Sequence, residues 1–96
     1  IVIDCLKADQ AQLAAAGAEL RPLVFGDKPD WAALYDKAQH AGKVIGGCML
    51  AGLVQEYLGG KKALPTDESW RARTVLEEFR KNEAGGATFH TTAGDL

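Results

Sequence analysis

The chain has 96 residues, 47% of them hydrophobic, and a formal net charge of −2 at pH 7. This size and composition predict a single domain, residues 1–96, with a hydrophobic core, and the slightly acidic balance makes nucleic acid an unlikely partner. The longest uncharged run, residues 44–55, is shorter than the roughly twenty residues of a membrane-spanning helix, so we expect no membrane span.

The first six residues are β-prone, and a helix is predicted to follow them from Asp9. Asp9 can cap the first turn, and Gln12, three residues later, can complete a capping box. Pro22 has no amide hydrogen to donate and clashes with the preceding turn, so this helix is predicted to end near Leu20. The apolar stripe of the helix consists of Leu13, Ala16, Gly17 and Leu20.

Residues 23–25, Leu-Val-Phe, allow two interpretations. They could form a short buried strand ended by Gly26, which would favour an α/β fold. The chain offers too few other strands for a crossover sheet, however. We therefore favour a hydrophobic elbow that fills the core between two helices, and the α/β fold stays as the alternative.

A second helix is predicted to begin at Asp27 or Asp30, since either residue can cap it and Pro29 suits a first turn. Its pattern continues through Gly42 into the next segment, which indicates a bend at that glycine. The predicted buried face consists of Trp31, Leu34, Tyr35 and Ala38. Asp36 and His40, four residues apart, are interpreted as an ordinary surface contact.

Residues 44–58 form an apolar segment that is predicted to be a buried central helix. Each glycine inside a helix costs about 1 kcal/mol relative to alanine, so close packing by a neighbouring backbone must offset the cost. That neighbour is either another helix of the chain or a second subunit. The predicted packing or partner-interface positions are Gly46, Gly47, Ala51 and Gly52. The glycine spacing fits neither a phosphate-binding loop nor a dinucleotide fingerprint.

The last helix is predicted to begin at the cap Thr66, with Asp67 and Glu68 in its first turn, and to follow a loop over residues 59–65. Its predicted buried stripe consists of Ala72, Val75, Leu76 and Phe79. The basic residues of this helix are Arg71, Arg73, Arg80 and Lys81. They suggest a weak nucleic-acid-binding hypothesis, which Glu77 and Glu78 weaken further by interrupting the basic face.

The end of the chain, residues 85–96, loses the helical pattern. Residues 87–92 are β-prone and contain His90. They are predicted either to pair with residues 1–5 as a small terminal ribbon or to form a flexible or partner-binding tail.

Cys5 and Cys48 lie 43 positions apart, and the sequence allows two states for them. We favour two unrelated buried thiols, because Cys48 lies in the most apolar segment and is expected to be inert there. The alternative is a disulfide in an exported protein, worth about 3–4 kcal/mol. No metal site is predicted, since neither cysteine has a second ligand nearby.

The sequence thus predicts an all-α fold: a bundle of three to four helices around a central Gly/Ala-rich helix, with a short terminal β ribbon as an option. No catalytic residues and no cofactor are predicted, because no nucleophile has a base beside it in the sequence. We favour a soluble, cytoplasmic, non-enzymatic module that binds a protein partner or forms a homo-oligomer. The alternative is a small-molecule or redox module with a site formed by Cys48, Trp31, Tyr35 and Met49.

Overall fold

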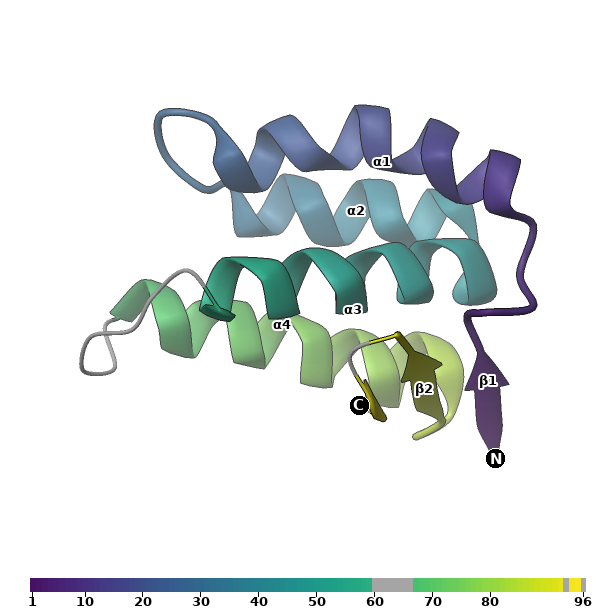
Figure 1. The fold of residues 1–96 in the computed structure, drawn as a ribbon. Coiled ribbons are helices and arrows are strands. Elements are labelled where there is room, and N and C mark those ends of the chain that lie inside the picture. Colours follow the sequence, from purple (N-terminus) through teal and green to yellow (C-terminus); the bar gives the residue numbers. More distant parts are fainter. Residues whose placement is uncertain (60–66, 93, 96) are drawn as a thin grey trace.

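The computed structural model describes residues 1–59, 67–92 and 94–95, which form four helices and a three-stranded sheet (Figure 1). The elements follow the chain in the order β1 (Val2–Asp4), α1 (Gln10–Phe25), α2 (Trp31–Ala41), α3 (Lys43–Gly59), α4 (Asp67–Ala84), β2 (Thr88–Thr91) and β3 (Gly94–Asp95). The helices make up well over half of the chain. The predicted helical bundle with a short β ribbon is therefore confirmed.

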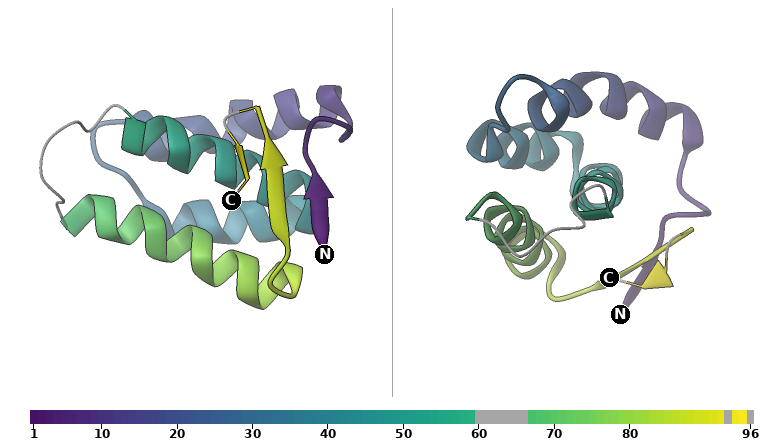
Figure 2. Two further views of the ribbon diagram at one scale, coloured as in Figure 1. Left: turned by 60° about the horizontal axis from the view of Figure 1, so that its bottom comes forward. Right: turned by 60° about the vertical axis from the view of Figure 1, so that its left-hand side comes forward.

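The apolar helix α3 lies at the centre of the bundle, as predicted. It packs against α1, α2 and α4, and Figure 2 shows it surrounded by the other elements. Its buried residues are Gly46, Gly47, Cys48, Leu50, Ala51, Leu53, Val54 and Tyr57. A helix that is apolar on nearly all sides is stable only where neighbours cover most of it, and here they do.

Helix α1 begins at the predicted cap but ends later than predicted. The Asp9 carboxylate accepts hydrogen bonds from the backbone N–H groups of the next turn. The predicted end near Leu20 is wrong, because the helix continues through Pro22 to Phe25. Leu20 and Val24 lie one turn apart and are both almost fully buried in the main core. Burying such a side chain contributes about 1.5–3 kcal/mol, which offsets much of the cost of an interior proline.

Residues 23–25 are consequently the last turn of α1, and both the elbow and the strand interpretations are wrong. Of the two predicted caps of α2, Asp30 is the one used, and its carboxylate accepts a hydrogen bond from the Ala33 N–H group. Gly42 ends α2 with a φ of 101°, a conformation that favours glycine, and α3 starts at the next residue. The sequence predicted a bend within a continuing helical pattern, but the structure ends one helix at Gly42 and begins another.

Helix α4 buries the predicted stripe, with Ala72 and Phe79 fully buried and Val75 and Leu76 partly buried. Of the predicted loop over residues 59–65, Gly59 is the last residue of α3, and residues 60–65 and the predicted cap Thr66 lie outside the described residues.

The two β-prone ends of the chain pair with each other. β1 runs parallel to β2, with Ile3 opposite Phe89, and β3 pairs with β2 in the antiparallel direction. Ala87 and Phe89 are fully buried, so this segment forms the predicted ribbon rather than a flexible tail. The sheet packs on α3 through a second core cluster, which consists of Cys5, Cys48, Ala51, Ala84, Ala87 and Phe89.

The two cysteines of the chain form a disulfide, so the favoured prediction of two unrelated thiols is wrong. The Cα atoms of Cys5 and Cys48 lie 5.6 Å apart. The sheet explains this proximity: the Cys5 N–H group donates to the His90 carbonyl at 2.9 Å, and Phe89 packs on Gly47, next to Cys48. Both cysteines are buried, as was predicted for Cys48.

Candidate functional site

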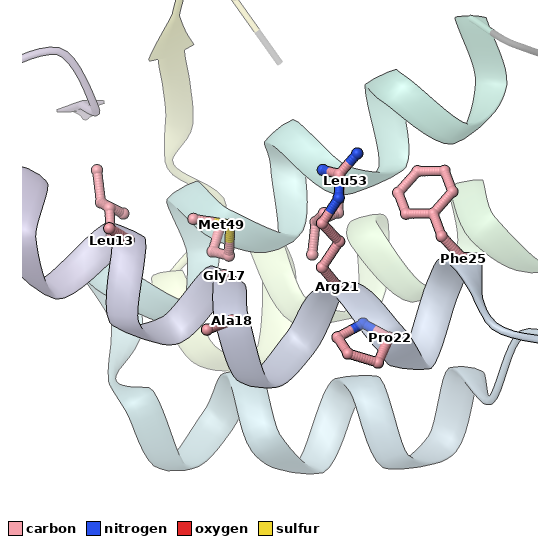
Figure 3. Close-up of a pocket in the computed structure, with 9 residues that line it drawn as sticks. Leu13, Gly17, Ala18, Arg21, Pro22, Phe25, Met49 and Leu53 are labelled. Atoms are coloured by element: carbon pink, nitrogen blue, oxygen red, sulfur yellow. The ribbon is translucent and has the colours of Figure 1, made fainter.

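An open groove runs between α1 and α3 (Figure 3). Its volume is about 610 Å³. Helix α3 contributes Met49 and Leu53, and α1 contributes Leu13 and Phe25 at the two ends. The remaining lining residues come from α1: Ala14, Gly17, Ala18, Arg21 and Pro22. Eight of these nine side chains are apolar or absent, so the groove favours an apolar ligand.

The floor of the groove depends on the small size of Gly17. A Cβ atom at this position would lie 3.3 Å from the Met49 Cε atom, closer than most side-chain contacts. The glycine therefore makes room for the methionine side chain. Methionine is flexible and polarizable, and it adapts to differently shaped apolar partners.

Arg21 lines the groove near Phe25 and forms an ion pair with Glu56 of α3. The Arg21 guanidinium donates two hydrogen bonds to the Glu56 carboxylate, at 2.8 and 2.5 Å. This hydrogen-bonded guanidinium holds the pKa of Glu56 below its usual value. The same guanidinium lies 4.8 Å from the centre of the Phe25 ring, which is 42% exposed. The contacts orient a large exposed aromatic side chain at the mouth of the groove.

The outer face of α1 beside the groove carries small uncharged residues. Its exposed alanines are Ala11, Ala14, Ala15 and Ala18. Within the helix only Glu19 and Arg21 are charged. A surface helix normally carries charged residues on its solvent face. This face therefore presents little polar surface that would have to lose water when another protein covers it.

The predicted interface positions on α3 lie mostly inside the domain. A Cβ atom on Gly46 would overlap the Ala38 carbonyl group of α2, and one on Gly47 would lie 2.5 Å from the Phe89 ring. Ala51 is fully buried. These three positions serve packing within the chain. Gly52 differs, because it is exposed and has no neighbouring atom within 4 Å of a Cβ position.

The predicted ligand residues do not form one pocket. Cys48 is bonded to Cys5, and Met49 lines the groove between α1 and α3. Trp31 and Tyr35 lie on α2 and face α4, where they line a separate surface pocket of about 290 Å³.

The polar atoms of both aromatic side chains have carboxylate partners. The Trp31 indole N–H donates to Glu68 at 2.6 Å, and the Tyr35 hydroxyl donates to Glu83 at 3.3 Å. Trp31 also contacts Tyr57 edge to face, with ring centres 5.2 Å apart. Both side chains therefore join α2 to its neighbours in the bundle.

Each of the two histidines lies near a carboxylate. His90 Nδ1 lies 2.6 Å from the Asp95 carboxylate, and Asp4 lies opposite His90 in the sheet. The hydrogen bond to Asp95, with the charges of Asp95 and Asp4, raises the pKa of His90. His40 lies 3.7 Å from the Asp36 carboxylate in an exposed surface contact.

Neither a metal site nor a membrane span is found in the part of the chain that the structure describes. Over those residues, His, Cys, Asp and Glu side chains nowhere gather in a group of three or more that could hold a metal ion. Likewise, none of the described helices is long and apolar enough to cross a membrane.

Comparison of the chain with protein-family models, with curated proteins and with solved structures found no match. The groove was not anticipated from the sequence, which pointed to residues of α3 and α2. The sequence of α1 nevertheless contained a signal, namely a run of alanines without charged residues. Once the buried side of the helix is known, such a run predicts an exposed apolar face suited to contact with another protein.

Proposed function

We propose that the protein is a non-enzymatic protein-binding module, and that the groove between α1 and α3 receives an apolar helix of a partner protein. The main support for this proposal is that the apolar groove continues into the charge-free alanine face of α1. Small residues let a second helix approach closely, as in helix packing within proteins. Recognition of an amphipathic helix by an apolar groove is a recurring mode of peptide binding.

Three side chains at the groove are of types common in protein contact sites: Arg21, Phe25 and Met49. Arg21 is held by its ion pair with Glu56, so it is ordered before a partner arrives. Preordered side chains lower the entropic cost of association.

The proposal is tested by adding charge at exposed positions that line the groove. The variant Ala14→Glu/Ala18→Glu places two carboxylates in the groove, and both positions are exposed, so the domain should still fold. The matched control Gln39→Glu/Asn82→Glu adds the same charge at exposed positions of α2 and α4, away from the groove and from the alanine face of α1.

Photo-cross-linking from residue 18 in the source cells, followed by mass spectrometry, identifies the partner and the segment that it contributes. Binding of the purified partner should fall by about tenfold or more in the groove variant and stay unchanged in the control. Equal binding by both variants would contradict the proposal. Cross-links between two copies of this chain, together with a dimer in sedimentation, would identify the occupant as a second subunit.

A second candidate function is binding of a small apolar molecule in the same groove, because its volume lies within the range of typical ligand sites. A redox role for Cys48 has less support, since both cysteines are buried and bonded to each other. Native mass spectrometry of the purified protein would detect a retained small molecule. Such a molecule, competing with the partner segment, would favour the second candidate.

We also propose that the protein works in an oxidising compartment outside the cytoplasm. Disulfides persist mainly in exported proteins, and the Cys5–Cys48 bond supports this location over the cytoplasm. Mass spectrometry of alkylated protein from its native source would report the oxidation state.

A further inference from the structure

Helix α4 lies on the opposite side of α3 from α1 (Figure 2). Its exposed surface includes a tryptophan with two arginines nearby. Trp70 is 59% exposed, the most exposed aromatic side chain among the described residues. The Arg73 guanidinium lies 5.5 Å from the centre of its ring, and Arg71 is exposed on the same turn. An exposed tryptophan is costly in water and is typical of contact sites.

The four basic residues of α4 differ in their pairing. Arg80 donates two hydrogen bonds to the Glu77 carboxylate, at 3.0 and 2.6 Å, and Lys81 lies 3.8 Å from the same carboxylate. The Glu77 carboxylate therefore pairs with both of these charges. Arg71 and Arg73, by contrast, form no ion pair with any side chain that the structure describes. The unpaired positive charge is confined to the turn that carries Trp70.

A surface hollow of about 470 Å³ extends this basic region onto the start of α2. It is lined by Arg71 together with Lys28, Pro29 and Trp31. Lys28 is exposed and, like the two arginines, forms no ion pair with a described side chain. Asp30 also lines the hollow, but its carboxylate already caps α2.

We propose that the surface formed by Trp70, Arg71 and Arg73 binds an acidic peptide segment of a partner protein, with one apolar side chain of that segment packed on Trp70. The guanidinium groups match carboxylates in charge and geometry and can bind them through two hydrogen bonds each. Trp70 supplies the apolar contact area between them. This surface is separate from the groove, and the inference holds whether or not the groove binds a partner.

A nucleic-acid strand fits this surface less well than an acidic peptide. Affinity for a phosphate backbone grows with the number of neutralised phosphates, and among the described residues only Arg71, Arg73 and Lys28 lie here without an ion pair. Glu77 and Glu78 begin one turn farther along the helix, where a long polyanion would have to pass. A short segment with two or three carboxylates avoids them.

The test uses a displayed library of random twelve-residue peptides and the full chain as bait. We expect the enriched sequences to combine several Asp or Glu residues with an aromatic or aliphatic residue. Binding of the leading synthetic peptide should fall about tenfold or more in both Trp70→Ala and Arg71→Ala/Arg73→Ala. In the parent protein, binding of this peptide should also shift the indole N–H signal of Trp70 in the NMR spectrum.

The matched control is Lys37→Ala/Lys43→Ala, which removes the same charge from two exposed positions elsewhere and should bind the peptide as the parent does. Circular dichroism of each variant tests whether it is folded. The inference is overturned if no acidic sequences are enriched, or if the arginine variant binds as the control does. It is also overturned if duplex DNA binds the parent at physiological salt more tightly than the peptide and loses that binding in the same variants.

Discussion

Gly46 and Ala38 bring α3 and α2 so close that a Cβ atom on Gly46 would overlap the Ala38 carbonyl group. Backbone cannot move aside as the end of a flexible side chain can. The close crossing of the two helices therefore depends on the absence of a Cβ atom at position 46. The intrinsic cost of glycine in a helix, about 1 kcal/mol, is offset by this contact.

The variant Gly46→Ala should consequently destabilise the domain by about 1–3 kcal/mol, the usual cost of overpacking. Gly52→Ala makes the same chemical change on the same helix, at an exposed position with open space around it. It should stabilise the domain by about 0.5–1 kcal/mol through helix propensity. Urea denaturation followed by circular dichroism measures both values. Equal effects from the two variants would show that the close contact is unimportant.

Pro22→Ala should stabilise the domain by up to about 3 kcal/mol, because Pro22 lies inside α1 and cannot donate a helical hydrogen bond. The position is exposed, so the smaller side chain should leave the core unchanged.

Pro29→Ala is the matched control, since Pro29 precedes α2 and costs no helical hydrogen bond. Its replacement should be neutral or slightly destabilising, because the unfolded chain gains freedom. The midpoint of urea unfolding reports both effects. A loss of stability in Pro22→Ala would contradict this account of the last turn of α1.

Reduction of the Cys5–Cys48 bond should lower the stability by about 3–4 kcal/mol, since the bond closes a long loop in the unfolded chain. For a domain of this size the melting temperature should fall by more than about 10 °C. Calorimetry with and without a phosphine reductant measures the change. The variant Cys5→Ala/Cys48→Ala should melt at the lower temperature with and without reductant. The prediction is refuted if the parent protein keeps the same melting temperature after its disulfide has been reduced.

Stability should also fall as the pH rises above neutrality, because of His90. Its pKa is raised above 6.5 by the hydrogen bond to Asp95, then by the charges of Asp95 and Asp4. A group whose pKa is raised in the folded state contributes its full stabilisation of the fold at pH values below its pKa in the unfolded chain. That contribution is lost as the pH rises through the pKa of the folded state. Melting temperatures from pH 6 to about pH 9 measure the decline.

The variant His90→Gln is the control for this pH dependence. Its melting temperature should vary less over the same range, because glutamine carries no titrating charge. The same slope in both proteins would show that another group is responsible.

Local signals in the sequence predicted most of the helices. Asp9 and Asp30 cap helices where capping residues were expected, and the stripe that includes Ala72 and Phe79 is buried. Pro22 misled the prediction because the burial of neighbouring side chains outweighs local propensity there.

The contacts between distant segments could not be predicted in the same way. The spacing of Cys5 and Cys48 does not encode proximity, which arises only when β1 pairs with β2 beside α3. The groove likewise depends on how far apart α1 and α3 lie at Gly17 and Met49. Such distances are set by the packing of the whole bundle, and no local periodicity carries them.

Phe89 completes the second core cluster, yet it follows α4 along the chain, far from its partner strand β1. The contacts among α1, α2 and α3 lie within residues 10–59, so they can form without Phe89. Loops that join distant segments also close more slowly than local contacts. The helices should therefore gain protection from hydrogen exchange before the sheet does during folding. The Cys5–Cys48 bond, once formed, keeps β1 beside Gly47 until β2 arrives to pair with it.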